Sequence, residues 1–298
     1  MAFNASECAY EGFRVVRKHP GAFAVWCLFY LLLVIALVVA VAATMAPMFM
    51  QYAHPGAAQA APWSDRAAAF FQNNLPIVLA GAAVLIPLIF IWSAMMVCAI
   101  YRAVLRPAET GFGYLRLGAD ELRMIGLYLL IWIVMLAAGL AGAGVMVGVS
   151  MAAKAQASGG AFILFGVLAC LAYIFVAVRL SLCGPQTFAE RRVDLFGSWR
   201  LTRGHFWGLL GMYVLVIVLV IVLQVGNVLL QLPFRAISDQ ISHDTMPGLA
   251  IFGVVALIYI VLAFAIGVLN LVVTEAPRAA AYRDLLPRAE DEAAKASA

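Results

Sequence analysis

Three amides within a long apolar segment are the residues best placed to do chemistry in this chain. Gln224, Asn227 and Gln231 are spaced i, i+3 and i+7, which puts them on one face of a helix. Polar groups in hydrocarbon are costly unless they find partners, so this face should turn toward other helices or toward water. It could line a path for a solute, or it could hydrogen-bond to Asn270 or Ser93 on a neighbouring helix. The second role is favoured.

Four charged residues stand at the ends of apolar segments. Arg102, Arg179 and Arg278 each close the second segment of a pair, and Glu275 precedes Arg278 by one helical turn. An ionisable residue at this depth is a functional candidate, although an ion pair with an arginine such as Arg179 would explain Glu275 structurally. Snorkelling toward lipid headgroups explains the arginines, and a shared pocket for an anionic headgroup is the alternative.

No catalytic pattern accompanies these residues. The sequence contains no GxSxG, HExxH or P-loop motif, and its five cysteines show neither a CxxC motif nor a Cys/His metal spacing. The sequence therefore favours a protein without catalytic activity, and it predicts no cofactor and no metal site.

The elements that must position these side chains are membrane-spanning helices. Of 298 residues, 65% are hydrophobic and 11% are charged, whereas a soluble domain carries about 25% charged residues. The apolar residues fall into blocks long enough to cross about 30 Å of hydrocarbon. We expect an all-α membrane protein with one domain over residues 1–287 and a disordered charged tail over 288–298. Its six transmembrane helices are expected at about 21–46, 75–101, 124–150, 160–183, 206–232 and 248–274.

The distribution of lysine and arginine sets the expected orientation. Sixteen of the 19 basic residues fall on one side of the predicted spans, and Arg66, Lys154 and Arg235 fall on the other. The basic side of short loops faces the cytoplasm. The sequence therefore predicts a multi-pass protein of the bacterial inner membrane with the N-terminus and the C-terminus in the cytoplasm. The same distribution explains the formal charge of +4 without nucleic acid as a partner.

Three segments that precede the first, third and fifth spans resemble one another. Residues 10–19, 112–121 and 196–205 each begin with an aromatic residue, followed three positions later by a large apolar residue and then by an arginine. This spacing is typical of an amphipathic interfacial helix. It predicts three repeats of such an elbow helix and a transmembrane hairpin, over about 1–106, 107–192 and 193–287. The alternative is that any segment leading into a span from the cytoplasm is rich in arginine and aromatic residues.

The third of these segments carries a family resemblance. FGSWRLTRGHFWGLL at 196–210, with a weaker echo near the N-terminus, resembles a pattern in uncharacterised bacterial six-span families. One of these is the membrane domain attached to some glycerophosphodiester phosphodiesterases. The resemblance implies a six-span fold in a membrane. It implies no phosphodiesterase activity, because the soluble catalytic domain is lacking in this sequence.

Two classes of function follow from these observations. The first is a non-enzymatic inner-membrane protein that binds or organises membrane lipid, with anionic headgroups contacting the elbow segments. The second is a small-solute transporter or channel that uses the polar face of the fifth span. The expected lipid contacts of the first class are Arg14, Arg116, Arg200 and Trp199.

Overall fold

The computed structural model describes residues 4–53, 72, 74–109, 111–152, 159–240 and 246–296. All the regular structure in these ranges is helical, which confirms the predicted fold class. Within them, six helices are long and apolar enough to cross a membrane. These are α3 (Pro20–Ala53), α5 (Leu75–Leu105), α6 (Ala119–Ala152), α7 (Gly159–Leu180), α10 (Phe206–Gln240) and α11 (Met246–Ala296).

Short elements connect the long helices on one side. They are α1 (Ala5–Ala9), α2 (Glu11–Lys18), η2 (Gly111–Tyr114), α8 (Cys183–Glu190) and α9 (Leu195–Leu201). Two of the three predicted elbow segments contain an α-helix, namely α2 and α9. The segment 112–121 instead forms a short 3₁₀ turn followed by irregular chain, because Phe112, Gly113 and Tyr114 all have positive φ angles that an α-helix does not allow. The threefold repeat stays a prediction.

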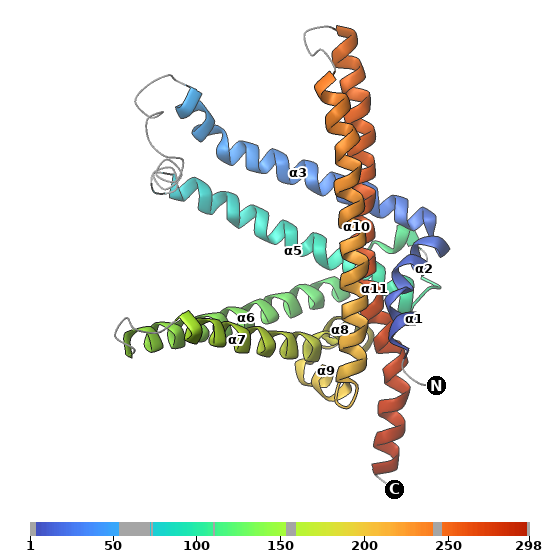
Figure 1. The fold of residues 1–298 in the computed structure, drawn as a ribbon. Coiled ribbons are helices and arrows are strands. Elements are labelled where there is room, and N and C mark those ends of the chain that lie inside the picture. The colour runs from blue at the N-terminus through green and yellow to red at the C-terminus, as the bar shows by residue number, and fades with distance from the viewer. Residues whose placement is uncertain are drawn as a thin grey trace.

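The long helices diverge from a common base. Figure 1 shows α3 and α5 extending side by side in one direction and α10 and α11 in another, while α6 and α7 extend in a third. The three pairs meet at the end where α1, α2 and α8 lie. Spans one, three and five all start from this end, because the chain crosses back within each pair.

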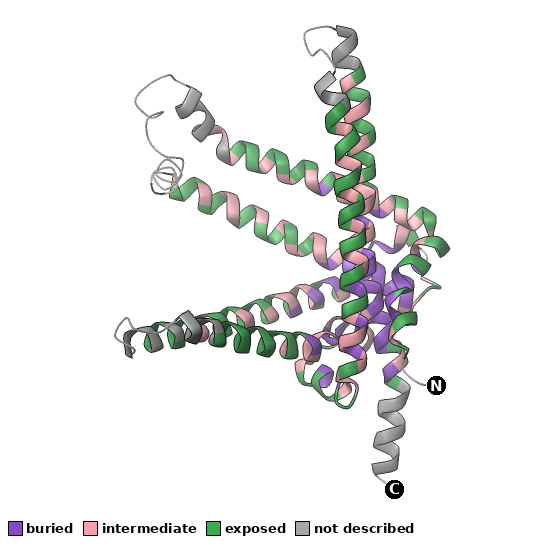
Figure 2. Cartoon of the chain, in the orientation of Figure 1, coloured by how far each residue is buried: buried purple, intermediate pink, exposed green. Residues whose placement is uncertain are grey.

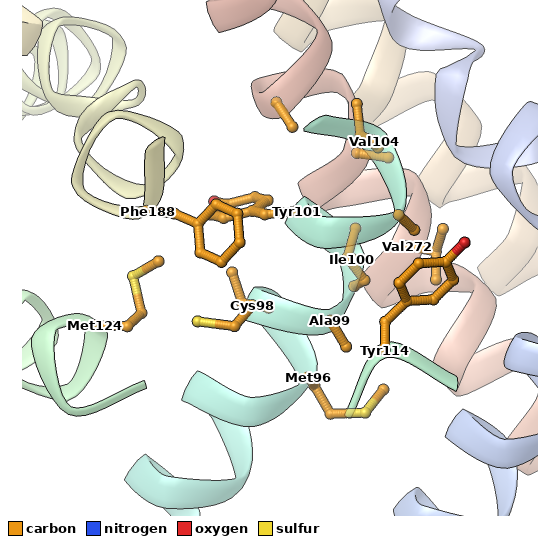
Figure 3. Packing of buried hydrophobic residues seen from close by; sticks show 14 of the residues in the cluster. Met96, Cys98, Ala99, Ile100, Tyr101, Val104, Tyr114, Met124, Phe188 and Val272 are labelled. Carbon is orange, nitrogen blue, oxygen red and sulfur yellow. The ribbon is translucent and has the colours of Figure 1, made fainter. Parts of the chain in front are cut away.

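The buried core lies at this common base (Figure 2). On α5 the buried residues run from Ala94 to Val104, and on α11 they run from Val268 to Leu285. Figure 3 shows Tyr101 of α5 against Phe188 of α8, whose ring centres are 6.1 Å apart. Further out, large apolar side chains are exposed along the spans, as expected for surfaces that face lipid chains.

Helix α11 packs against most of the other helices at the base. It contacts α1, α2, α3, α5, α8, α9 and α10. Four alanines on α11 are almost completely buried, and small side chains of this kind let neighbouring helices approach closely. They are Ala276, Ala279, Ala280 and Ala281.

The disorder predicted for the tail at 288–298 stays a prediction. Helix α11 continues through Ala296 without a break. This end of the chain is rich in alanine and contains two glutamates, which are strong helix formers, so its charge does not prevent a helix. Residues 297–298 lie outside the described part of the chain.

The packing of α2 against α11 can be tested at Gly12. A Cβ atom at Gly12 would lie 2.7 Å from the Cα of Val273, so Gly12→Ala must push the two backbones apart. Overpacking of this kind costs about 1–3 kcal/mol. We expect Gly12→Ala to lower the temperature at which the detergent-solubilised protein loses its helical circular dichroism. Gly21→Ala is the matched control, because its Cβ would meet nothing within 4 Å. Equal stability of the two variants would contradict this packing.

Candidate functional site

A buried ion pair joins the end of α5 to the start of α6. The side chains of Arg102 and Glu121 are 4% and 2% exposed and form a direct salt bridge. Arg102 Nη1 also donates to the carbonyl oxygen of Tyr114 at 2.9 Å, and the Gly118 N–H donates to Glu121 Oε2 at 2.9 Å. Snorkelling of Arg102 toward lipid headgroups was expected from the sequence. The structure instead places the Arg102 guanidinium inside the protein, where the Glu121 carboxylate neutralises its charge.

A charged hollow of about 420 Å³ lies around this ion pair. We call it the basic hollow. Five arginines and three carboxylates line it, so its lining carries two excess positive charges. Its charged residues are Arg102, Arg106, Arg116, Arg123, Arg191, Glu109, Asp120 and Glu121.

The outer ion pairs of the basic hollow are looser than the buried one. Arg123 lies 2.7 Å from Asp120, whereas Arg106 lies 3.8 Å from the same carboxylate. Arg116 lies 3.4 Å from Glu109, and both side chains are more than one-third exposed. Two arginines share Asp120, so guanidinium N–H groups remain available to an incoming anion.

Backbone strain is concentrated beside the basic hollow. Among the residues that the structure describes, three other than glycine have positive φ: Phe112 (36°), Tyr114 (64°) and Arg191 (56°). The first two belong to the α5–α6 loop, and Arg191 ends α8 and lines the hollow itself. Such conformations cost about 1–3 kcal/mol each and are typical of functional sites.

A second, mainly apolar cavity of about 490 Å³ lies between α5, α6, α7, α10 and α11. We call it the tyrosine cavity. Its polar lining consists of four tyrosines with Ser181 and Arg278, and most of its other lining is aliphatic. The tyrosines are Tyr101, Tyr128, Tyr173 and Tyr213.

Glu275 lies behind this cavity and pairs within its own helix. Its carboxylate accepts a hydrogen bond from Arg278 Nη1 at 2.8 Å and from the Tyr101 hydroxyl at 2.9 Å. Glu275 thus pairs with an arginine, but the partner is Arg278, one turn away on α11, and not the suggested Arg179. The Arg179 guanidinium lies instead over the rings of Phe175 and Trp199, at 5.3 and 5.4 Å.

The predicted polar face of the fifth span is only partly buried. Gln224 is exposed, and Asn227 and Gln231 are half-buried on α10. The side-chain oxygens of Asn227 and of Asn270 on α11 are each buried without a hydrogen-bond partner among the described residues. These two oxygens therefore accept no bond from one another's amides, and the suggested contact of Asn227 with Asn270 is not made through them.

The predicted lipid-contact arginines are exposed, and each lies near a carboxylate. Arg14 is 2.9 Å from Glu11, and Arg200 is 3.7 Å from Asp194. Arg116 belongs to the basic hollow. Trp199 is 39% exposed. All four side chains are accessible at the base of the helix pairs.

Metal binding and thiol reactivity are two further kinds of chemistry to consider. The described residues include no group of three or more His, Cys, Asp or Glu side chains able to hold a metal ion. The Cys8 thiol is buried and donates to Asp284 Oδ2 at 3.5 Å. Burial, together with the Asp284 carboxylate, raises the pKa of Cys8 to about 12, so little thiolate is present at neutral pH.

Sequence reasoning missed Glu121, Tyr101 and Tyr213. A carboxylate three residues before a predicted span was a usable signal for Glu121, because it needs a cation at that depth. The tyrosines gave no such signal, since aromatic residues are common near membrane interfaces.

Comparison with models of known protein families, with curated proteins and with solved structures finds no match to this chain.

The buried ion pair can be tested by neutralising one partner. Glu121→Gln leaves the Arg102 charge buried and uncompensated, which costs about 3–5 kcal/mol. We expect a large fall in the thermal stability of the purified protein. Glu109→Gln, which removes the exposed partner of Arg116, should cost less than about 1 kcal/mol. Similar small effects of both substitutions would show that the Arg102–Glu121 pair does not hold the base together.

Proposed function

We propose that this protein is a non-enzymatic integral membrane protein that binds anionic membrane lipid at the base of its helix pairs. The basic hollow carries this proposal, because it combines an excess of arginine with space for a ligand. Planar guanidinium groups present paired N–H donors that match the oxygens of a phosphate.

The place of the basic hollow suits a lipid headgroup. Its residues come from the last turn of α5, from the loop that follows, from the start of α6 and, for Arg191, from the end of α8. These segments stand where spans of this length reach the headgroup region. The exposed Arg14, Arg200 and Trp199 enter or precede spans on the same side, so they extend the surface offered to headgroups.

We further propose that this surface faces the cytoplasmic leaflet of the inner membrane. The excess of basic residues on this side supports an inner-membrane protein whose two termini lie in the cytoplasm. The cytoplasmic leaflet carries anionic lipids, and each nearby basic residue contributes about 1 kcal/mol to their attraction. The protein would thereby gather anionic lipid around its base.

The proposal is tested by removing three exposed arginines together. We expect Arg14→Gln, Arg116→Gln and Arg200→Gln in one chain to reduce co-purified phosphatidylglycerol by at least about tenfold, given the contribution of each charge. Mass spectrometry of the detergent-purified protein measures the bound lipid. The control removes three charges from the opposite side: Arg66→Gln, Lys154→Gln and Arg235→Gln. Unchanged lipid in the first variant would overturn the proposal.

A second candidate is a small-solute path along α10, favoured by the buried oxygen of Asn227, which has no hydrogen-bond partner among the described residues. Single cysteines at Gln224, Asn227 and Gln231 in a cysteine-free chain should then react with a membrane-impermeant thiol reagent. Cysteines at Val225 and Leu229 should stay unlabelled, because these residues lie off the polar face. Absence of labelling at all three polar positions would dismiss the transport function.

A further inference from the structure

We propose that the tyrosine cavity binds an acyl lipid, whose anionic oxygens accept hydrogen bonds from Arg278 and Tyr213 and whose chain lies along α6 and α10. This site is separate from the basic hollow, and it involves none of the arginines on which the lipid surface proposed above depends.

The tyrosine cavity changes from polar to apolar along the direction of the spans. Helices α6 and α10 run away from the base, and α7 and α11 run back toward it. Tyr101 and Ser181 lie near the ends of α5 and α7, and Arg278 lies within the stretch of α11 that is packed at the base, so all three line the end of the cavity near the base. Met135 and Ile217 line the far end, so the cavity has the polarity of a lipid seated in the adjacent leaflet.

The size of the cavity fits the anionic group of a lipid and part of one acyl chain. On α6 its lining extends from Leu127 to Met135, a length of about 12 Å at 1.5 Å per residue. Its volume of about 490 Å³ falls within the range of about 300–1,000 Å³ that is usual for small-molecule sites. The long, mainly aliphatic wall suits an acyl chain better than a polar solute.

Two buried donors at the polar end keep unused hydrogen-bonding capacity in the described part of the protein. The hydroxyl of Tyr213 and Nε of Arg278 are both buried and form no hydrogen bond of full geometry among these residues, although the hydroxyl lies close enough to Ser181 and Arg278 to interact with both. The Arg278 guanidinium carbon lies 6.0 Å from the centre of the Tyr213 ring, so the two groups are neighbours. A buried polar group left unpaired is costly, and ligand oxygens at this point would remove that cost from both groups.

Charge further defines the ligand. Glu275 engages only Nη1 of Arg278, and the carboxylate is not part of the cavity lining. The described lining thus presents a guanidinium and hydroxyl groups to the ligand, and no anion. A carboxylate or a phosphate on an acyl chain satisfies this arrangement. Free fatty acids and phospholipids share this chemistry.

The test uses two photoactivatable probes with the full chain in nanodiscs of zwitterionic lipid. One probe is palmitic acid with a diazirine in its chain, and the other is phosphatidylglycerol with the same diazirine-bearing chain. We expect crosslinks on the α6 stretch Ile131–Met135 and the α10 stretch Val214–Ile217, mapped by mass spectrometry. Crosslinking by palmitic acid alone identifies a fatty-acid site, and crosslinking by phosphatidylglycerol alone identifies a phospholipid site. Crosslinking by both shows a site for acyl anions in general, and crosslinking by neither overturns the proposal.

Tyr213→Phe is the decisive variant. Its hydroxyl forms no hydrogen bond of full geometry among the described residues, and the variant keeps the ring, so the fold should stay intact while crosslinking falls about tenfold, the effect of one charge-assisted hydrogen bond. Tyr173→Phe is the matched control, because this tyrosine lines the apolar part of the cavity beside Ile174. Equal crosslinking of the two variants would overturn the role of Tyr213 and with it the proposed site.

Two further variants distinguish a probe inside the cavity from a probe on the outer surface of the spans. Arg278→Lys keeps a positive charge beside Glu275 but removes Nε, so we expect crosslinking to fall without loss of folding. Ala177→Phe fills the cavity and should abolish crosslinking by both probes. The triple Arg14, Arg116 and Arg200 variant should crosslink normally, so failure of the lipid surface and failure of this site are distinguishable. Unchanged crosslinking in Ala177→Phe would place the probes outside the cavity and overturn the proposal.

Discussion

The buried ion pair between Arg102 and Glu121 is the interaction on which the base of this protein depends. A single charge within a membrane span costs about 2.5–3.5 kcal/mol, and pairing removes much of that cost only when both partners are held in place. The α5–α6 loop provides this support, through the Tyr114 carbonyl and the Gly118 N–H. Trp26 of α3 donates to the Gly113 carbonyl at 2.6 Å, which ties the first span to the same loop.

The absence of a hydrophobic driving force between helices in lipid explains where the core lies. Lipid chains are as apolar as leucine, so spans associate through close packing and polar contacts instead. Both are found at the base, where the alanines of α11 are buried and the charged groups are paired. Away from the base the helices carry large aliphatic residues on exposed faces. The tyrosine cavity opens at the transition between these two regions, where α7 meets its neighbours.

The sequence predicted the elements well and their side-chain partners poorly. Six apolar blocks are visible in the sequence because the thickness of a bilayer sets the length of each span. The partner of Arg102 was hidden, because Glu121 reaches it only after the loop folds back with left-handed residues at Phe112 and Tyr114. The polar face at Gln224 was visible, but its surroundings depend on how α10 packs.

The central position of α11 has a consequence for how the protein enters the membrane. Glu275 and Arg278 lie one turn apart, so α11 carries its own counter-charge into the bilayer. Arg102 has no such neighbour on its own helix, and its charge stays unmatched during synthesis until Glu121 emerges. The last of the six spans to leave the ribosome is also the one that covers α2, α3 and α5. The contacts of α2, α3 and α5 with α11 can therefore form only once this last span has been made.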